Sequence, residues 1–405
     1  MFLQLKRMLT VGIAASVAFV GFSAAPQAAQ AAPSASAVSK ASKWLVAHPA
    51  TTDDGYLYKV YNATGIAAAQ APGSGAALRT RVRELRDGAQ AAVAAKPTLA
   101  PYLAILVDAL HLSPRKFGGV DLVSTIRSSV TNGDYSYAYG QALAIIALKR
   151  SGAAVPSTLV GDLIAGQTKT GPDAGAFGYS DGTTFFADPD STALAIQALD
   201  LVGRSKYSGT VRLAAAWAVA NQTKEGFWGK WSPVDSTALM ATALTTVKPS
   251  AVKGLKVAAS HTKAYRWLKT QQLGDGGFPA SLGGTTSDQM ATFDAVFLLK
   301  GKVWSTFTYK LGRFTTVSAP KIVGTKKVGS TLSVKLGTWR PKLATNTTVS
   351  YRWLRSGKAI PGATAATYTL VAADAGKHVR VKVTVSEVGL KTVTKVSAAT
   401  KKIAA

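Results

Sequence analysis

The chain has 405 residues and no cysteine, and its 47 Lys and Arg exceed its 20 Asp and Glu, for a formal net charge of +27. Without cysteine it can form neither a disulfide nor a thiolate, so its stability has to come from large apolar cores, and its length suggests two domains or more. Such a positive field favours anionic polymers, or it only keeps an exported protein soluble.

The first residues have the pattern of a secretory signal peptide. Lys6 and Arg7 precede an apolar run that reaches Phe22, and small residues ending in Ala29-Gln30-Ala31 follow. This order predicts a signal peptide over residues 1–31, and the apolar run is too short for a membrane span. We therefore expect a secreted protein without a membrane span, released or held non-covalently at the cell wall.

Residues 40–302 contain a repeated unit of helix, glycine-aromatic loop and helix. Three such loops align, with Phe177, Phe227 and Phe278 in equivalent positions. Weaker copies extend the series backwards, which makes about six helix pairs. The twelve predicted helices cover 42–48, 61–71, 78–95, 99–112, 120–130, 139–150, 159–167, 190–202, 211–222, 235–247, 264–272 and 288–299.

These helices alternate in composition. One set is nearly all Ala, Leu, Ile and Val, and such helices are buried on several sides. The other set includes Arg and Lys, as in 78–95, and should face water. Six buried helices alternating with six amphipathic ones predict an all-α (α/α)6 toroid, an inner ring of helices inside an outer one.

The chain changes character near residue 301. We expect a linker over 303–318, followed over 319–403 by an all-β sandwich, because Val and Thr alternate with polar residues and Gly and Pro recur every eight to twelve positions. Trp353 lies where immunoglobulin-like sandwiches keep a core tryptophan. Residues 319–405 have 16 Lys and Arg against 2 Asp and Glu, which favours contact with an anionic cell-envelope polymer rather than nucleic acid.

Two stretches resemble a known superfamily. "WLKTQQLGDGGF" (267–278) and "DPDSTALAIQAL" (188–199) are similar to the repeats of prenyltransferases and squalene cyclases, which form an α/α toroid. The resemblance is clearest over 119–300 and weaker over 41–118. The superfamily includes terpene cyclases, zinc-dependent protein prenyltransferases, cobalamin carriers and thioester-containing domains. The segment 319–403 resembles the immunoglobulin-like repeats common in secreted actinobacterial proteins.

Two of these activities are excluded by the residues present. Protein prenyltransferases hold zinc with an aspartate, a cysteine and a histidine, and thioester domains also need a cysteine. This chain has no cysteine, and its four histidines have no metal-ligand spacing: His48, His111, His261 and His378. We therefore expect no metal and no cofactor.

The resemblance to squalene cyclases implies one candidate catalytic residue. They protonate an alkene with the middle aspartate of Asp-x-Asp-Asp-Thr-Ala, so the resemblance implies Asp190 as donor and Asp188 as its neighbour, although Ser191 replaces the third aspartate. The alternative is structural: Asp188 followed by proline is typical of a helix start, with Asp190 placing charge at the helix dipole. The position recurs as Asp235 and Asp288, and a catalytic acid should be singular. We favour the cap.

Aromatic side chains gather in the loops between outer and inner helices, where they would crowd one rim of a toroid. The recurrent phenylalanines are expected to fill seams between helix pairs. The others either do the same or form a ligand site over an apolar cavity. These ligand-binding candidates are Tyr137, Tyr179, Phe185, Phe186, Trp228 and Trp231.

The sequence thus predicts a secreted or cell-surface binding protein. The toroid would hold an apolar or planar small molecule, a peptide or a glycan, and the basic sandwich would contact an anionic cell-envelope polymer. Two alternatives stay open: a terpene-cyclase-like enzyme that uses Asp190 as proton donor, and a structural surface protein without a ligand. The sequence names neither the ligand nor the oligomeric state.

Overall fold

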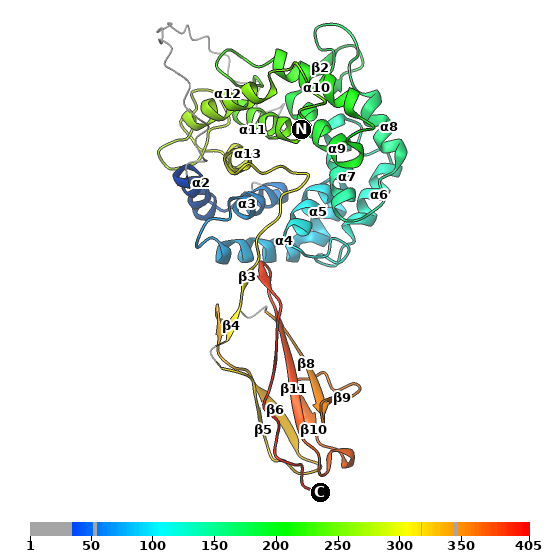
Figure 1. The fold of residues 1–405 in the computed structure, drawn as a ribbon, viewed down its shortest axis with the longest axis vertical. Helices are drawn as coiled ribbons and strands as arrows, with labels where there is room; N and C mark the ends of the chain where they lie inside the picture. The colour runs from blue at the N-terminus through cyan, green and yellow to red at the C-terminus, as the bar shows by residue number, and fades with distance from the viewer. Residues whose placement is uncertain (1–34, 52–54, 317, 344–346) are drawn as a thin grey trace. The chain divides into compact units, whose positions relative to one another are not determined.

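The structure is a computed structural model that describes residues 35–51, 55–316, 318–343 and 347–405. The predicted signal peptide, residues 1–31, lies outside these residues. The described chain has a helical domain, whose helices begin at Ala35 and end at Lys300, and a β-rich C-terminal region with small sheets (Figure 1). None of the described helices has the length and apolarity that a membrane span needs.

The helical domain contains an α-helix at each of the twelve predicted positions. Pro97–Leu99 adds a 3-10 turn before α5, and β1 (Gly178–Ser180) and β2 (Phe185–Ala187) form a hairpin before α9. The helices are α2 (Ala35–Ala47), α3 (Gly55–Ala69), α4 (Gly75–Ala95), α5 (Ala100–Ala109), α6 (Leu122–Thr131), α7 (Ala138–Arg150), α8 (Ser157–Ala165), α9 (Pro189–Gly203), α10 (Ser208–Ala220), α11 (Pro233–Thr246), α12 (Val257–Thr270) and α13 (Gln289–Lys300).

Burial alternates along this series, as the composition predicts. Helix α11 is buried from Pro233 to Leu244, whereas α4 buries only a stripe that includes Leu78, Val82 and Leu85. Such a stripe is typical of an amphipathic helix with one face in water. The odd-numbered helices α3, α5, α7, α9, α11 and α13 each contact the next, and α13 also contacts α3.

A glutamine before each of the three glycine-aromatic loops ties that loop to a neighbouring helix. The side-chain amides of Gln167, Gln222 and Gln272 each donate to a carbonyl in their own loop and to a second carbonyl elsewhere, over 2.8–3.0 Å. The loop acceptors are Gly175, Gly226 and Gly276, and the second acceptors are Thr210, Ser260 and Ala37. The repeat is therefore a hydrogen-bonding unit.

The loop glycines are required by close packing. Gly175 has φ +99°, and a Cβ there would lie 2.3 Å from the carbonyl oxygen of Leu213. Gly226 and Gly276 have φ +116° and +98°, and a Cβ at these positions would lie 2.9 Å and 2.8 Å from the carbonyl oxygens of Lys263 and Lys40. Only glycine combines this backbone conformation with such an approach.

Hydrogen bonds from the loop backbone correct one detail of the predicted alignment. The backbone N–H groups of Phe177 and Phe278 donate to Thr192 and Thr292, at 2.9 Å and 2.8 Å. In the middle repeat the equivalent donor to Thr237 is Trp228, at 3.0 Å. Trp228, not Phe227, is thus the counterpart of the two phenylalanines, because the register is set by hydrogen bonds rather than by ring type.

The β-rich region has two main sheets that share one apolar core. Its strands are β3 (Gly312–Arg313), β4 (Thr315–Thr316), β5 (Lys321–Val323), β6 (Thr331–Lys335), β7 (Trp339–Arg340), β8 (Thr348–Arg355), β9 (Lys358–Ala359), β10 (Thr367–Thr369), β11 (Val379–Ser386), β12 (Leu390–Lys391) and β13 (Val393–Val396). The larger sheets have the strand orders β10-β6-β5 and β13-β11-β8-β9, while β12 pairs with β3 and β4 with β7. Leu332, Trp353 and Val381 are fully buried in the shared core, so Trp353 is a core tryptophan, as expected.

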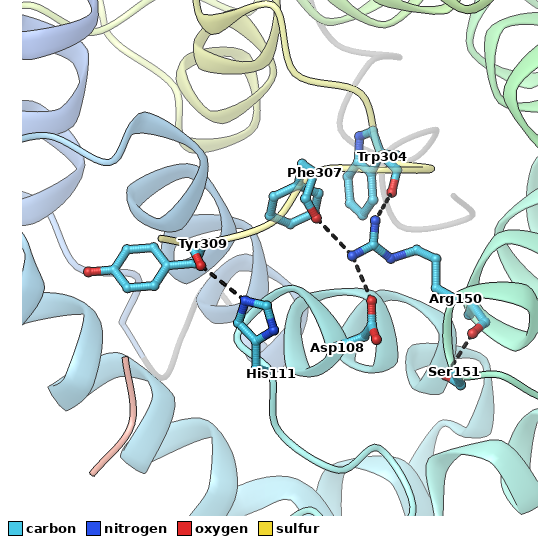
Figure 2. Close-up of polar contacts among 8 residues, drawn as sticks. Asp108, His111, Arg150, Ser151, Trp304, Phe307 and Tyr309 are labelled. Atoms are coloured by element: carbon cyan, nitrogen blue, oxygen red, sulfur yellow. Dashed lines mark hydrogen bonds and ion pairs between the residues drawn. The ribbon is translucent and has the colours of Figure 1, made fainter. Parts of the chain in front are cut away.

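The start of the predicted linker packs into the helical domain. Trp304 and Phe307 are each 2% exposed and belong to the core of the helices. Arg150, at the end of α7, donates to the carbonyls of Trp304 and Phe307 at 3.1 Å and 2.8 Å and pairs with Asp108 at 2.7 Å (Figure 2). Residues 304–307 are thus held by a buried guanidinium rather than spanning a gap freely.

We predict that Arg150→Lys lowers the free energy of unfolding by about 2 kcal/mol, because an ammonium cannot reproduce the planar fork that reaches three acceptors. Chemical denaturation followed by helical circular dichroism measures this loss. Arg204→Lys is the matched control, since Arg204 forms an exposed pair with Asp200 and should change stability by less than about 0.5 kcal/mol. Equal losses in the two variants would contradict a special role for Arg150.

Candidate functional site

The two aspartates before α9 have different environments. Asp188 is the N-cap: its carboxylate accepts hydrogen bonds from the backbone N–H of Asp190 and of Ser191, at 3.3 Å and 2.9 Å, and also from the Ser191 hydroxyl. This is the cap that the Asp-Pro sequence predicts. Asp188 therefore caps the N-terminus of α9 by itself, and the cap does not require the side chain of Asp190.

Asp190 is half-buried as a residue, but its carboxyl group is largely removed from water. Its Oδ1 atom is inaccessible and has no hydrogen-bond partner among the described residues. Burial, and then the neighbouring charge of Asp188, raise the pKa of Asp190 to about 8, while the Ser236 hydroxyl acts in the opposite direction. The carboxyl is therefore mostly protonated at neutral pH. This shift reduces the negative charge that the sequence pattern assigns to Asp190 at the helix start.

Two further aspartates belong to the same group. Asp235 is 1% exposed in the first turn of α11, and Asp294 is 4% exposed in the middle of α13. Each has a buried Oδ1 without a partner among the described residues. Burial is the main cause that raises the pKa of each well above its usual range, and the charges of Asp235 and Asp190 raise that of Asp294 further. Helices α9, α11 and α13 thus bring three mutually interacting acids together.

Three tyrosines lie beside these acids. The hydroxyls of Tyr61, Tyr102 and Tyr139 hydrogen-bond one another, and the charge of Asp294 raises the pKa of all three. Burial is the largest cause in each case, and it raises the pKa of Tyr102 to about 12. All three phenols therefore stay protonated. We call Asp190, Asp235, Asp294, Tyr61, Tyr102 and Tyr139 the acid-tyrosine cluster.

Trp304 bounds this cluster with its aromatic ring. It stacks on Phe297 with ring centroids 5.6 Å apart and meets Tyr102 edge to face at 6.3 Å. Its indole Nε1 is buried without a normal hydrogen bond, although the indole lies close enough to Asp294 to lower the pKa of that carboxyl slightly. The segment held by Arg150 thus contributes a ring to the interior of the helical domain.

Burial favours the neutral form of every group in the acid-tyrosine cluster. Protonated carboxyls and phenols can each donate one hydrogen bond and accept others. A buried carboxylic acid with a raised pKa can also give its proton to a bound molecule, which is how general acids work. The arrangement is therefore able to bind polar groups and to donate protons.

Asp190, Asp235 and Asp288, which the sequence pattern aligns with one another, occupy two different positions in the repeat. Counted from the loop-binding threonines, Asp288 corresponds to Asp188, and it caps α13 by accepting from the backbone N–H of Ala291 at 2.9 Å. Asp235 corresponds to Asp190, and Met290 occupies that position in the third repeat. The caps recur, and the buried acid occurs twice. Asp190, Asp235 and Asp288 therefore do not share one helix-start position, contrary to the predicted alignment.

Four of the predicted ligand residues lie at the β1–β2 hairpin and the start of α7. Tyr179 stacks on Phe186 with centroids 5.1 Å apart and meets Tyr137 edge to face at 6.2 Å. Tyr137 and Phe186 are each 40% exposed, and Phe185 is half-buried. Tyr137, Tyr179 and Phe186 thus form a continuous set of rings at the surface, which we call the aromatic strip.

The two predicted tryptophans have opposite environments. Trp228 is 1% exposed, and its indole N–H donates to the carbonyl of Ala218 at 2.7 Å. Trp231 is 73% exposed and precedes α11. Trp228 therefore has the position expected of a ring that fills a seam, whereas Trp231 remains available to a ligand.

Sequence reasoning missed most of the acid-tyrosine cluster. The sequence pattern marks Asp235 only as a cap, and it does not single out Asp294, Tyr61 or Tyr102. One signal for Asp294 is present, since it is the sole charged residue in the apolar run "ATFDAVFLL" (291–299), and such a residue is rarely buried without a reason. The tyrosines have no comparable signal, because their convergence depends on helices that are distant in sequence.

No group of three or more His, Cys, Asp or Glu is arranged to hold a metal ion within the described parts of the chain.

No protein-family model and no curated protein matches the chain. Solved structures similar to it include a protein from Actinoplanes, with 17% identity and a TM-score of 0.48 over 67% of this chain and 99% of that one. A possible member of the GH105 family from Salmonella enterica has 14% identity and a TM-score of 0.47, over 69% and 96% of the two chains. Haptocorrin in complex with Cbi has 11% identity and a TM-score of 0.43, over 83% and 94%. These similarities are too distant to bear on function.

Proposed function

We propose that the helical domain is an α/α toroid of the kind found in prenyltransferases and squalene cyclases, and that it binds a small molecule at the acid-tyrosine cluster. The contacts that run from α3 through α13 and back to α3 support a closed ring. Two hydrogen bonds support it independently, because they join the last repeat to the first helix: Gln272 donates to the carbonyl of Ala37 at 2.9 Å, and Trp44 donates to Asp275 at 2.9 Å.

The unpaired carboxyl oxygens of Asp190, Asp235 and Asp294 support the binding proposal most directly. A buried polar atom without a partner costs about 1–3 kcal/mol, and a ligand that supplies the partner would recover this energy. Because burial favours the protonated form of these acids, they suit hydroxyl or amide groups rather than a wholly apolar molecule. Among the expected ligands, a glycan or a peptide therefore fits better than a hydrocarbon.

We assign the β-rich region a second binding role. It is proposed to be an immunoglobulin-like sandwich that contacts an anionic cell-envelope polymer, with the whole protein secreted or at the cell surface. The 16 Lys and Arg against 2 Asp and Glu in residues 319–405 support this. The exposed aromatic strip and Trp231 would then meet the ring face of a ligand that reaches the helical domain.

Mass spectrometry of small molecules released from the mature protein tests the binding role. The protein should be purified from its own secreted fraction and denatured to release what it holds. We expect one compound in near-stoichiometric amount, rich in hydroxyl or amide groups. A ligand-free protein whose melting temperature no glycan or peptide raises would favour the structural alternative.

Substitutions at Asp190 should separate hydrogen bonding from ionisation. We predict that Asp190→Ala weakens binding of the recovered ligand about tenfold, because one buried hydrogen bond is lost. Asp190→Asn should retain most of the affinity, since a neutral amide also offers a donor and an acceptor. Calorimetric titration measures both. If Asn weakens binding as much as Ala, the ligand requires the carboxyl itself.

The raised pKa of Asp190 favours a second candidate function. A carboxyl that stays protonated to about pH 8 holds the proton that alkene protonation needs, the role that the resemblance to terpene cyclases implies, while the same raised pKa makes it a weaker donor. Incubation with squalene and shorter polyprenes tests this by product analysis. A cyclised product that disappears in Asp190→Asn would establish catalysis, and no product with the wild type would leave binding alone.

A further inference from the structure

Three basic residues share one exposed face of the four-stranded sheet. Arg352 on β8 lies directly opposite Lys382 on β11, and Arg380 is two residues before Lys382 on the same strand. Residues two apart in a strand point to the same side, and their neighbours Trp353 and Val381 fill the core on the other side. All three basic residues are exposed. We call Arg352, Arg380 and Lys382 the cationic face.

The arrangement within the cationic face is unfavourable in the free protein. Directly opposite side chains on paired strands have Cβ atoms about 5 Å apart, and like charges at such positions repel. The only acidic residues in 319–405 are engaged elsewhere: Asp374 is buried and pairs with Arg355 at 2.6 Å, and Glu387 accepts from Thr347 at 2.7 Å. No carboxylate of this region is therefore free to neutralise Arg352 and Lys382.

A surface concavity of about 620 Å³ adjoins the cationic face. Arg380 and Leu354, which are directly opposite each other on β11 and β8, both line it. Ser356, His378 and Thr400 contribute polar groups to its wall. Arg380 thus belongs both to the cationic face and to the wall of a concavity that is large enough to hold part of a ligand.

The surroundings favour a polymer over a bilayer. The hydroxyls of Thr384 and Thr394 lie 3.0 Å apart on the same side of the sheet as Lys382, and such groups suit a sugar or polyol. Binding at a bilayer surface is strengthened by inserted apolar or aromatic side chains. Beside the cationic face the exposed large apolar side chain is Val396, directly opposite Lys382, and one valine gives little to insert. Two of the three cations are arginine, whose planar fork matches the oxygens of a phosphate.

We propose that the cationic face docks a phosphodiester-linked polymer of the cell envelope, with successive phosphates on Arg352, Lys382 and Arg380 and one repeat unit in the adjoining concavity. This inference rests on the proposed binding role of the β-rich region and names both its surface and its ligand chemistry. An anion seated between Arg352 and Lys382 removes their mutual repulsion as well as forming new bonds.

The test uses the mature full chain and purified glycerol-phosphate teichoic acid, with binding measured over a range of salt concentrations. The variant R352Q/R380Q/K382Q should bind about tenfold more weakly at physiological salt. The slope of log affinity against log salt should fall by about 2, because three phosphate contacts are lost. A melting curve verifies that the exposed substitutions leave the fold intact.

A matched variant separates the cationic face from diffuse charge. K321Q/K327Q/K335Q removes the same charge from exposed positions near the other sheet, where Lys321 and Lys335 also lie opposite each other. It should retain most of the affinity and of the salt slope. Equal losses in both variants would overturn the cationic face while leaving anionic-polymer binding in place.

Two further probes test the class of ligand. Polygalacturonate presents carboxylates in place of phosphates, and vesicles that contain phosphatidylglycerol present phosphates on a bilayer. Both should bind the wild type more weakly than the teichoic acid, and stronger binding to either would overturn the assignment to a phosphodiester polymer. A wild type that binds none of the three would contradict the proposed role of the β-rich region itself.

Discussion

Replacing Trp228 with alanine is expected to lower the free energy of unfolding of the helical domain by about 3–5 kcal/mol. The ring is 1% exposed, its indole N–H donates to the carbonyl of Ala218 at 2.7 Å, and its backbone N–H donates to Thr237. Truncation would leave a cavity and an unpaired buried carbonyl. Urea denaturation followed by circular dichroism at 222 nm gives the change.

Trp231→Ala is the matched control, because the same residue type three positions later is 73% exposed. Its stability should stay within about 0.5 kcal/mol of the wild type, as for most surface substitutions. Any effect of Trp231 should be seen in ligand affinity instead. A Trp228→Ala protein that keeps its melting temperature but loses the ligand would return Trp228 to the binding residues.

Stability should fall as pH rises from 5 to 8. Asp190 has a pKa of about 8 in the folded protein, raised first by burial and then by Asp188, against about 3.9 in an unfolded chain. Over this range the folded state keeps a proton that the unfolded state has released, so increasing pH favours unfolding. Asp190 alone would lower the free energy of unfolding by about 3 kcal/mol between pH 5 and 7.5, and Asp235 and Asp294 act in the same direction.

Asp190→Asn should flatten this dependence, because it removes one of the titrating groups. It should therefore be more stable than the wild type at pH 7.5 and similar to it near pH 4. Asp181→Asn is the control: bonds from the backbone of Thr184 are the first cause that lowers the pKa of Asp181, so it is ionised in both states above pH 5. An unchanged slope in Asp190→Asn would show that this carboxyl is already ionised in the folded protein.

The repeats predicted the helices well because helix formation and capping depend on nearby residues. The apolar periodicity located all twelve, and the Asp-Pro pair before α9 predicted the N-cap at Asp188. Trp353 was likewise predicted as a core residue from its strand context. In these cases the interacting residues are close together in the sequence, or the residue type itself strongly favours a buried position.

The acid-tyrosine cluster could not be predicted in the same way. Asp190 and Asp235 have the same local sequence pattern as a helix start, and only the packing of α11 between α9 and α13 removes their carboxyl groups from water. A carboxyl's pKa depends on water and charges within a few ångströms, which residues distant in sequence provide. The sequence motif was therefore recognised while its protonation state was not.

The amino-acid sequence by itself determined the twelve helices, the change from helices to strands near residue 301 and the charge of the C-terminal region, because these follow from periodicity and composition. The tertiary structure decided which side chains meet. It placed Trp228 in the core and Trp231 in solvent, packed Trp304 beside Asp294, and set Arg352 opposite Lys382. Those outcomes depend on contacts between elements, and local sequence does not contain that information.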